Sequence, residues 1–261
     1  MEDMRMRLNI LISGLACAGF VLAAQAEDKK PADAWDSKLV IGANAARGNS
    51  EVTTVTAGIL GDRKLGSNEM HLGLEGNYGA TDITQADGSS KTDTSAQNAH
   101  AFATYRRLLD ERTFVSPLVD LTHDKIAYIN YRLMAGAAVG RYLIKSDNQN
   151  LSAELGADFI REEIAGYDDI DSMTDNRGAL RIAQRYDVKL KTGAKIWEAV
   201  EYLPTFDNFG RYLMNAEIGA ETAMTEHINI RVVVQDKYNS RPPDAKKSND
   251  LLVTAGLSWA L

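Results

Sequence analysis

The segment Leu251-Leu252-Val253-Thr254-Ala255-Gly256-Leu257-Ser258-Trp259-Ala260-Leu261 alternates bulky apolar residues with small or polar ones up to the carboxyl end. A period of two indicates a β-strand with one apolar face and one polar face. Because no later residues can cover the apolar face, the pattern is typical of the last strand of an outer-membrane β-barrel, which lipid covers. We therefore interpret three residues of this face as a signal for the barrel-assembly machinery: Leu257, Trp259 and Leu261.

The amino-terminal end has the three parts of a secretory signal peptide. Arg5 and Arg7 precede an apolar segment at 8–22, and Ala24-Gln25-Ala26 supplies a small-x-small cleavage site. The apolar segment, about fifteen residues, is shorter than the roughly 20 that a membrane-spanning helix requires. The expected domains are a cleaved signal peptide at 1–26, a short periplasmic segment at 27–36 and a barrel at 37–261.

The composition argues against several classes of protein. The only cysteine, Cys17, lies in the predicted signal peptide, so we expect no disulfide and no thiol chemistry in the mature chain. The formal net charge of −7 and the lack of a basic cluster argue against nucleic-acid binding. The mean hydropathy of −0.28 is typical of soluble proteins. It does not argue against a barrel, because barrels hide their lipid-facing residues by alternation.

Alternation and turn residues predict an all-β chain of about 12 antiparallel strands. Most expected strands are long enough to cross a membrane at a tilt, whereas soluble sandwiches favour strands of about 5–6 residues. The pattern is least regular near 181–202. The expected strands are 38–47, 52–65, 69–81, 96–108, 113–123, 130–144, 151–164, 176–188, 192–203, 209–222, 227–239 and 249–261.

The lengths of the connections give an independent argument for a barrel. Odd-numbered connections of a bacterial barrel face outward and are long, while even-numbered ones face the periplasm and are short. Long connections are expected at 82–95, 165–175 and 240–248, whereas every even-numbered connection is short. The first connection, near 48–50, is short and fits this rule poorly.

Closure of the sheet would place the polar faces of the strands in the lumen, because charged residues at mid-membrane cost about 2–4 kcal/mol when they face lipid. These side chains could line a conducting pore, or they could pair across the interior and plug it. The expected lumen-facing residues are His71, Glu75, Arg132, Glu154, Asp158, Glu217, Glu221, Arg231 and Lys237.

Aromatic residues near strand ends are candidates for the girdles that settle at membrane–water interfaces. They could instead be ordinary sheet or core residues. The candidates are Tyr78, Tyr105, Tyr128, Tyr131, Tyr142, Trp197, Tyr202, Tyr212, Tyr238 and Trp259.

Several local patterns, in this order, resemble the YdiY-like family of salt-induced outer-membrane proteins, which carries the domain of unknown function DUF481. They are Ala46-Arg47-Gly48-Asn49-Ser50-Glu51, Tyr131-Arg132-Leu133 with Gly136 and Gly140, Glu201-Tyr202-Leu203-Pro204, and Tyr238-Asn239-Ser240-Arg241-Pro242-Pro243. The resemblance covers about residues 35–261 and implies a fold and a location but no activity. The family usually ends in Phe, so we expect Leu261→Phe to insert at least as well.

Enzymatic motifs are weak in this sequence. A lipid hydrolase would need a nucleophile, a histidine base and an orienting carboxylate, and His123 near Asp120 and Asp124 is the only local arrangement of interest. A histidine at the barrel rim is the better interpretation. The acidic loop at 167–176 lacks the glycine and the final Glu of a calcium-binding motif, so a solvated loop is favoured over a metal site.

The sequence therefore predicts an outer-membrane β-barrel that is not an enzyme and has no cofactor. Its expected role is a narrow passive channel or a structural barrel; the link to salt or osmotic stress comes from the family resemblance alone. The alternatives are an outer-membrane lipid hydrolase and a soluble periplasmic barrel that binds a ligand. Expected partners are outer-membrane lipid, the barrel-assembly machinery, periplasmic chaperones, and small ions or solutes.

Overall fold

The computed structural model of the protein describes residues 33–46, 51–84, 89–166, 171–243 and 246–261. These residues form twelve β-strands in sequence order. The predicted signal peptide lies outside the described residues, so its cleavage stays a prediction. The strands are β1 (Asp36–Ala46), β2 (Glu51–Leu65), β3 (Asn68–Thr84), β4 (Ser90–Leu108), β5 (Thr113–Asp124), β6 (Ile129–Lys145), β7 (Gln149–Ile164), β8 (Met173–Lys189), β9 (Lys195–Pro204), β10 (Tyr212–Ala223), β11 (Ile228–Asn239) and β12 (Asn249–Ala260).

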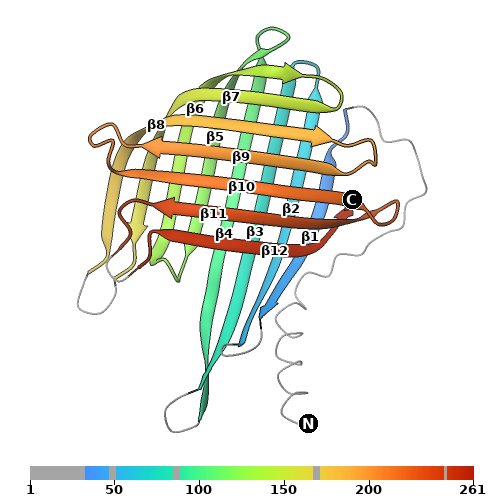
Figure 1. Ribbon diagram of the computed structural model, residues 1–261. Coiled ribbons are helices and arrows are strands. Elements are labelled where there is room, and N and C mark those ends of the chain that lie inside the picture. The colour runs from blue at the N-terminus through green and yellow to red at the C-terminus, as the bar shows by residue number, and fades with distance from the viewer. Residues whose placement is uncertain (1–32, 47–50, 85–88, 167–170, 244–245) are drawn as a thin grey trace. The chain divides into compact units, whose positions relative to one another are not determined.

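Every strand pairs antiparallel with its neighbours in sequence, and β1 pairs with β12 to close the barrel. The closing ladder runs from Lys38 opposite Ala260 to Ala43 opposite Ala255. Figure 1 shows β8–β12 crossing in front of β2–β6, as expected of strands that tilt in a closed barrel. The prediction of an antiparallel barrel of about 12 strands is confirmed.

The barrel has two different ends. Short connections at 66–67, 109–112, 146–148, 190–194 and 224–227 lie at the end that we call the turn end, together with the start of β1 and the finish of β12. Gly66 (φ 57°) and Gly193 (φ 86°) adopt the left-handed conformation that two of these turns require. The opposite end is called the loop end. In bacterial barrels the end with short turns faces the periplasm.

One of the predicted long connections is wrong. Residues 82–95 were expected to form a loop, but β3 continues to Thr84 and β4 begins at Ser90. The two strands extend past the rest of the barrel as a hairpin (Figure 1). Threonine and serine are abundant in this segment, and β-branched residues favour an extended backbone even without an apolar face. The first connection, at 47–50, lies outside the described residues.

The outward face of the barrel is apolar and exposed. Large side chains such as Leu74, Leu155 and Ile218 are each more than half exposed, and Trp259 is 43% exposed. The alternation seen in β12 holds in the structure: Leu257, Trp259 and Leu261 are exposed, and Ser258 between them is buried. Such an extended apolar surface on a closed sheet requires an apolar environment. Among the described residues, no helix has the length and apolar character needed to span a membrane.

Large inward-facing aromatic rings pack against glycines on neighbouring strands. A Cβ atom added to Gly73 would lie 2.3 Å from the ring of Phe102, and one added to Gly140 would lie 2.3 Å from the ring of Phe114. A Cβ on Gly219 would lie 2.0 Å from the ring of Trp197. Nearer the loop end, an apolar cluster fills part of the interior: Met134, Ile160, Ala179, Leu203 and Leu213. These contacts narrow the lumen on the side of β5–β10.

Candidate functional site: the charged lumen

Polar side chains of non-neighbouring strands contact one another inside the lumen near the turn end. Arg106 of β4 donates to Glu154 of β7 over 2.5 Å, and these strands are not neighbours. Tyr142 of β6 donates to Glu69 of β3 over 2.6 Å. The Arg106 guanidinium also lies 4.8 Å from the ring centre of Phe114. The two hydrogen bonds tie together strands that have no backbone hydrogen bonds with each other.

A second group lies beside the seam between β1 and β12. Lys38 of β1 pairs with Glu221 of β10 over 2.7 Å, and the buried Ser258 hydroxyl donates to the same carboxylate over 3.0 Å. The guanidinium of Arg231 lies 4.8 Å from the ring centre of Trp197. Lys38 and Glu221 are 183 residues apart in sequence, so their pairing depends on closure of the barrel.

Four carboxylates gather farther inside, and we call them the acidic belt: Glu75, Asp120, Asp158 and Glu201. Arg181 pairs with Asp158 over 3.3 Å and also with Glu201. Asp120 accepts a 2.5 Å hydrogen bond from His100, which stands opposite Glu75 in the β3–β4 ladder. The charges of Asp158 and Glu201 are both close enough to Asp120 to be repelled by it.

The acidic belt is partly exposed to solvent and is not fully paired. The side chains of Asp120 and Glu201 are 17% and 16% exposed. Among the described residues, Glu75 forms no ion pair, and Oδ1 of Asp158 is buried without a hydrogen-bond partner. Four carboxylates face one arginine and one histidine here, so the formal charge of the belt is negative even when His100 is protonated. Carboxylate rings of this kind favour cations in pores.

Near the loop end, a chain of alternating charges lies above the apolar cluster. Glu162 contacts Arg132 and Arg177, the latter over 3.6 Å. Asp175 accepts a hydrogen bond from Arg177 over 2.5 Å and another from Arg211 in the β9–β10 connection. These pairs compensate one another, in contrast to the acidic belt.

The residues predicted to face the lumen occupy inward positions of their strands. Glu154, Glu221 and Arg231 contact side chains from non-neighbouring strands, which places them inside the barrel. His71 forms a 2.7 Å hydrogen bond with Asp62, and Glu217 accepts hydrogen bonds from Trp197 and Gln235. Lys237 is exposed near the loop end, opposite Asp250. The surroundings of Glu75, Arg132 and Asp158 are those described above. Their roles stay predictions.

Two of the aromatic candidates follow the alternative interpretation, as buried residues. Tyr142 and Trp197 were candidates for the interfacial girdle, but both point into the lumen and are buried. Each has a polar atom that reaches a carboxylate, which explains why the interior accepts it. In contrast, Tyr202, Tyr212 and Tyr238 contact one another near the loop end, with ring centres 5.2 and 5.5 Å apart.

The structure does not assemble the histidine arrangement that a hydrolase would need. Nδ1 of His123 bonds the carbonyl oxygen of Asn130 over 2.8 Å. Asp120 bonds His100 instead and points inward. Within the described residues, no group of three or more His, Cys, Asp or Glu side chains could hold a metal ion. Part of the acidic loop, 167–170, lies outside the described residues.

Sequence reasoning missed much of the interior network. Arg106, Asp120, Arg181 and Glu201 all face the lumen, yet none was a candidate. For Arg181 the sequence did hold a usable signal, which was the spacing of the arginines in β8. Arg181 is four residues from both Arg177 and Arg185, so all three share one face of this strand. Alanines at positions 179 and 183 alternate with these arginines, so the inward face of β8 does not stand out as polar in the sequence.

A protein-family model described as "Protein of unknown function, DUF481" matches residues 39–260. The chain belongs to the DUF481 family. The match covers all twelve strands except the first residues of β1. No curated protein sequence matches the chain.

Solved structures similar to this DUF481 chain are outer-membrane barrels. The NanC porin has a TM-score of 0.51 at 11% identity, covering 86% of this chain and 100% of that one. The KdgM porin has a TM-score of 0.45 at 9% identity over 86% and 99% of the two chains. The translocator domain of the autotransporter NalP from Neisseria meningitidis has a TM-score of 0.46 at 12% identity over 100% and 95%. At these identities the likeness to NanC shows the fold alone.

Proposed function

We propose that this protein is a narrow passive channel of the outer membrane that prefers small cations. The observation that carries the proposal is the acidic belt, where four carboxylates face a single arginine and solvent reaches the side chains of Asp120 and Glu201. A wall of fixed negative charge in a low-dielectric surround raises the local concentration of cations. The aromatic rings and the apolar cluster on the β5–β10 side limit the path to small, hydrated species.

The exposed apolar face supports an outer-membrane location over a soluble periplasmic barrel, since a soluble protein rarely exposes a surface of this kind. Export through the predicted signal peptide, and insertion guided by Leu257, Trp259 and Leu261, belong to the same proposal. A passive cation path would also connect the protein to salt or osmotic stress of the envelope. A lipid hydrolase has less support, because His123 and Asp120 bond other groups.

Planar-bilayer recording of the purified protein tests the proposal. We expect single-channel steps in potassium chloride and, under a salt gradient, a reversal potential displaced toward the potassium equilibrium potential. Glu75→Gln should reduce this displacement, because it removes an unpaired belt charge. Glu198→Gln is the matched control, since Glu198 lies on the outward face of β9 and bonds Gln184. A bilayer without steps would favour the structural barrel, and an anion preference would contradict the role of the belt.

A further inference from the structure

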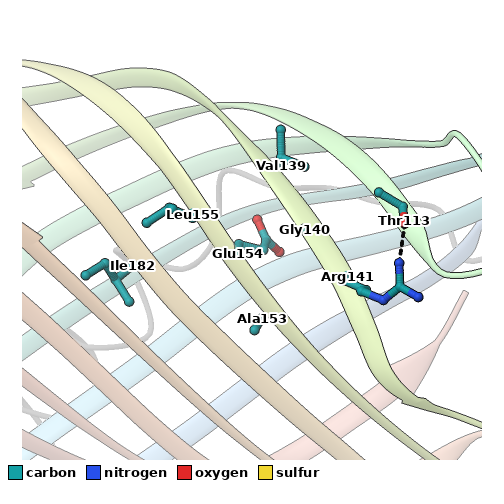
Figure 2. Close-up of a pocket in the computed structure, with 8 residues that line it drawn as sticks. All are labelled: Thr113, Val139, Gly140, Arg141, Ala153, Glu154, Leu155 and Ile182. Atoms are coloured by element: carbon teal, nitrogen blue, oxygen red, sulfur yellow. Dashed lines mark hydrogen bonds between the residues drawn. The ribbon is translucent and has the colours of Figure 1, made fainter.

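A groove of about 340 Å³ lies on the barrel wall where β5, β6, β7 and β8 run side by side (Figure 2). Its sides are the large side chains of Val139, Leu155 and Ile182, which are 58%, 59% and 44% exposed. Val139, Leu155 and Ile182 form one row across the sheet, and the small residue Ala153, opposite Arg141 in the next row, leaves the groove open. The exposed apolar residues belong to the outward face, so the groove opens toward the membrane rather than the lumen.

Arg141 closes the turn-end side of this groove. Its guanidinium donates to the Thr113 hydroxyl over 3.0 Å and forms no ion pair within the described residues (Figure 2). The nearby carboxylate of Asp110 already accepts the amide hydrogens of Arg112 and Thr113. Glu154 also borders the groove, but its charge is paired with Arg106 inside the barrel. Arg141 therefore places a guanidinium that forms no ion pair with the described residues at the end of an apolar groove.

The depth of Arg141 suits a lipid headgroup. Tyr131, near the loop end of β6, shares the outward face with Arg141, and ten residues separate them. With a rise of about 3.3 Å per residue and a strand tilt near 40°, these positions lie about 25 Å apart along the barrel axis, which is the usual height of the apolar band. An apolar band that begins at Tyr131 would therefore end at the depth of Arg141.

We propose that this groove binds one phospholipid of the periplasmic leaflet. The lipid phosphate pairs with the Arg141 guanidinium, and one acyl chain lies over Ala153 and against Val139, Leu155 and Ile182. A guanidinium and a phosphate form charge-assisted hydrogen bonds. The groove also contacts more methylene groups of the acyl chain than a flat barrel wall would. The site is independent of conduction through the lumen.

Native mass spectrometry of the purified barrel, titrated with phosphatidylglycerol in detergent, tests this proposal. We expect one tightly bound lipid per barrel, about tenfold weaker binding for Arg141→Gln because the charged contact is lost, and loss of the tight site for Ala153→Phe because the ring fills the groove. Uncharged diacylglycerol should bind the wild type weakly and should not distinguish Arg141→Gln from it.

Two variants elsewhere on the outward face serve as matched controls. Arg161→Gln removes an exposed arginine that bonds the Tyr131 hydroxyl at the loop end, and Ala57→Phe adds a ring to β2, away from the groove. Both should retain the tight lipid. Equal lipid binding by the wild type, Arg141→Gln and Ala153→Phe would overturn the proposal. So would equal losses in the controls, or a mass showing two barrel chains held together at the groove without lipid.

Discussion

Arg106 and Glu154 meet inside the lumen, with Nη2 of the arginine 2.5 Å from Oε1 of the glutamate. Their strands, β4 and β7, are separated by two others in the sheet. The contact therefore ties together two arcs of the wall that have no backbone hydrogen bonds with each other. Arg106 has further contacts with Tyr142 and with the ring of Phe114.

Arg106→Met should destabilise the folded barrel by about 3–5 kcal/mol, because it leaves the buried Glu154 carboxylate without its partner. Equilibrium unfolding by urea in lipid vesicles gives the free energy of unfolding. The double variant Arg106→Met/Glu154→Gln should lose less than Arg106→Met alone, since the uncompensated charge is then absent. If the double variant were less stable than Arg106→Met, the interpretation of this pair as a charge-compensating contact would be wrong.

Gly140→Ala should destabilise the barrel by about 1–3 kcal/mol through overpacking. A Cβ atom at this position would lie 2.3 Å from the ring of Phe114, which is itself fully buried. Gly76→Ala is the control, because the nearest atom to its Cβ would be 3.7 Å away. The same unfolding experiment should show little change or a small gain for Gly76→Ala. Equal losses for both variants would point to backbone conformation rather than to the ring contact.

The fold was predictable because alternation is a local property of each strand. In β12 the bulky and small residues separate cleanly, and both the outward face and the class of fold follow from them. In β8 the inward alanines at 179 and 183 and the outward Gln184 weaken the pattern. For that reason Arg181 and its place in the acidic belt were not predicted.

The contacts across the lumen could not have been read from the sequence. Lys38 meets Glu221 only because the sheet closes with a particular stagger between β1 and β12. The sequence around Lys38 or Glu221 does not indicate which residue is its partner. The inward direction of Tyr142 and Trp197 was missed for a related reason. An aromatic residue near a strand end suits both an interface and a lumen, and the carboxylates that bind these two lie on other strands.

Asp110, in the connection between β4 and β5, should give a pH-dependent contribution to stability. Hydrogen bonds from the backbone amides of Arg112 and Thr113 lower the pKa of its carboxyl group to about 2. Because the folded-state pKa lies below the ordinary aspartate value of 3.8, the contribution is fully present above that value and is lost as the pH falls toward 2. The stability difference between the wild type and Asp110→Asn, measured by urea unfolding, should therefore shrink between pH 5 and pH 2. A difference that stayed constant over this range would contradict the assignment.

Trp197 and Trp259 should respond differently to quenchers placed in the lipid. Trp197 is 8% exposed and faces the lumen, where it donates to Glu217, whereas Trp259 is 43% exposed on the outward face. Fluorescence of single-tryptophan variants can be measured in vesicles containing lipids brominated on the acyl chains. A variant that retains only Trp259 should be strongly quenched, and one that retains only Trp197 should be almost unaffected. Iodide added to the water should quench neither strongly, because lipid shields one ring and the packed lumen shields the other. Strong quenching of Trp197 by brominated chains would mean that the face of β9 carrying Trp197 points toward the membrane. The inward positions of Glu201 and Leu203, which share that face, would then be wrong as well.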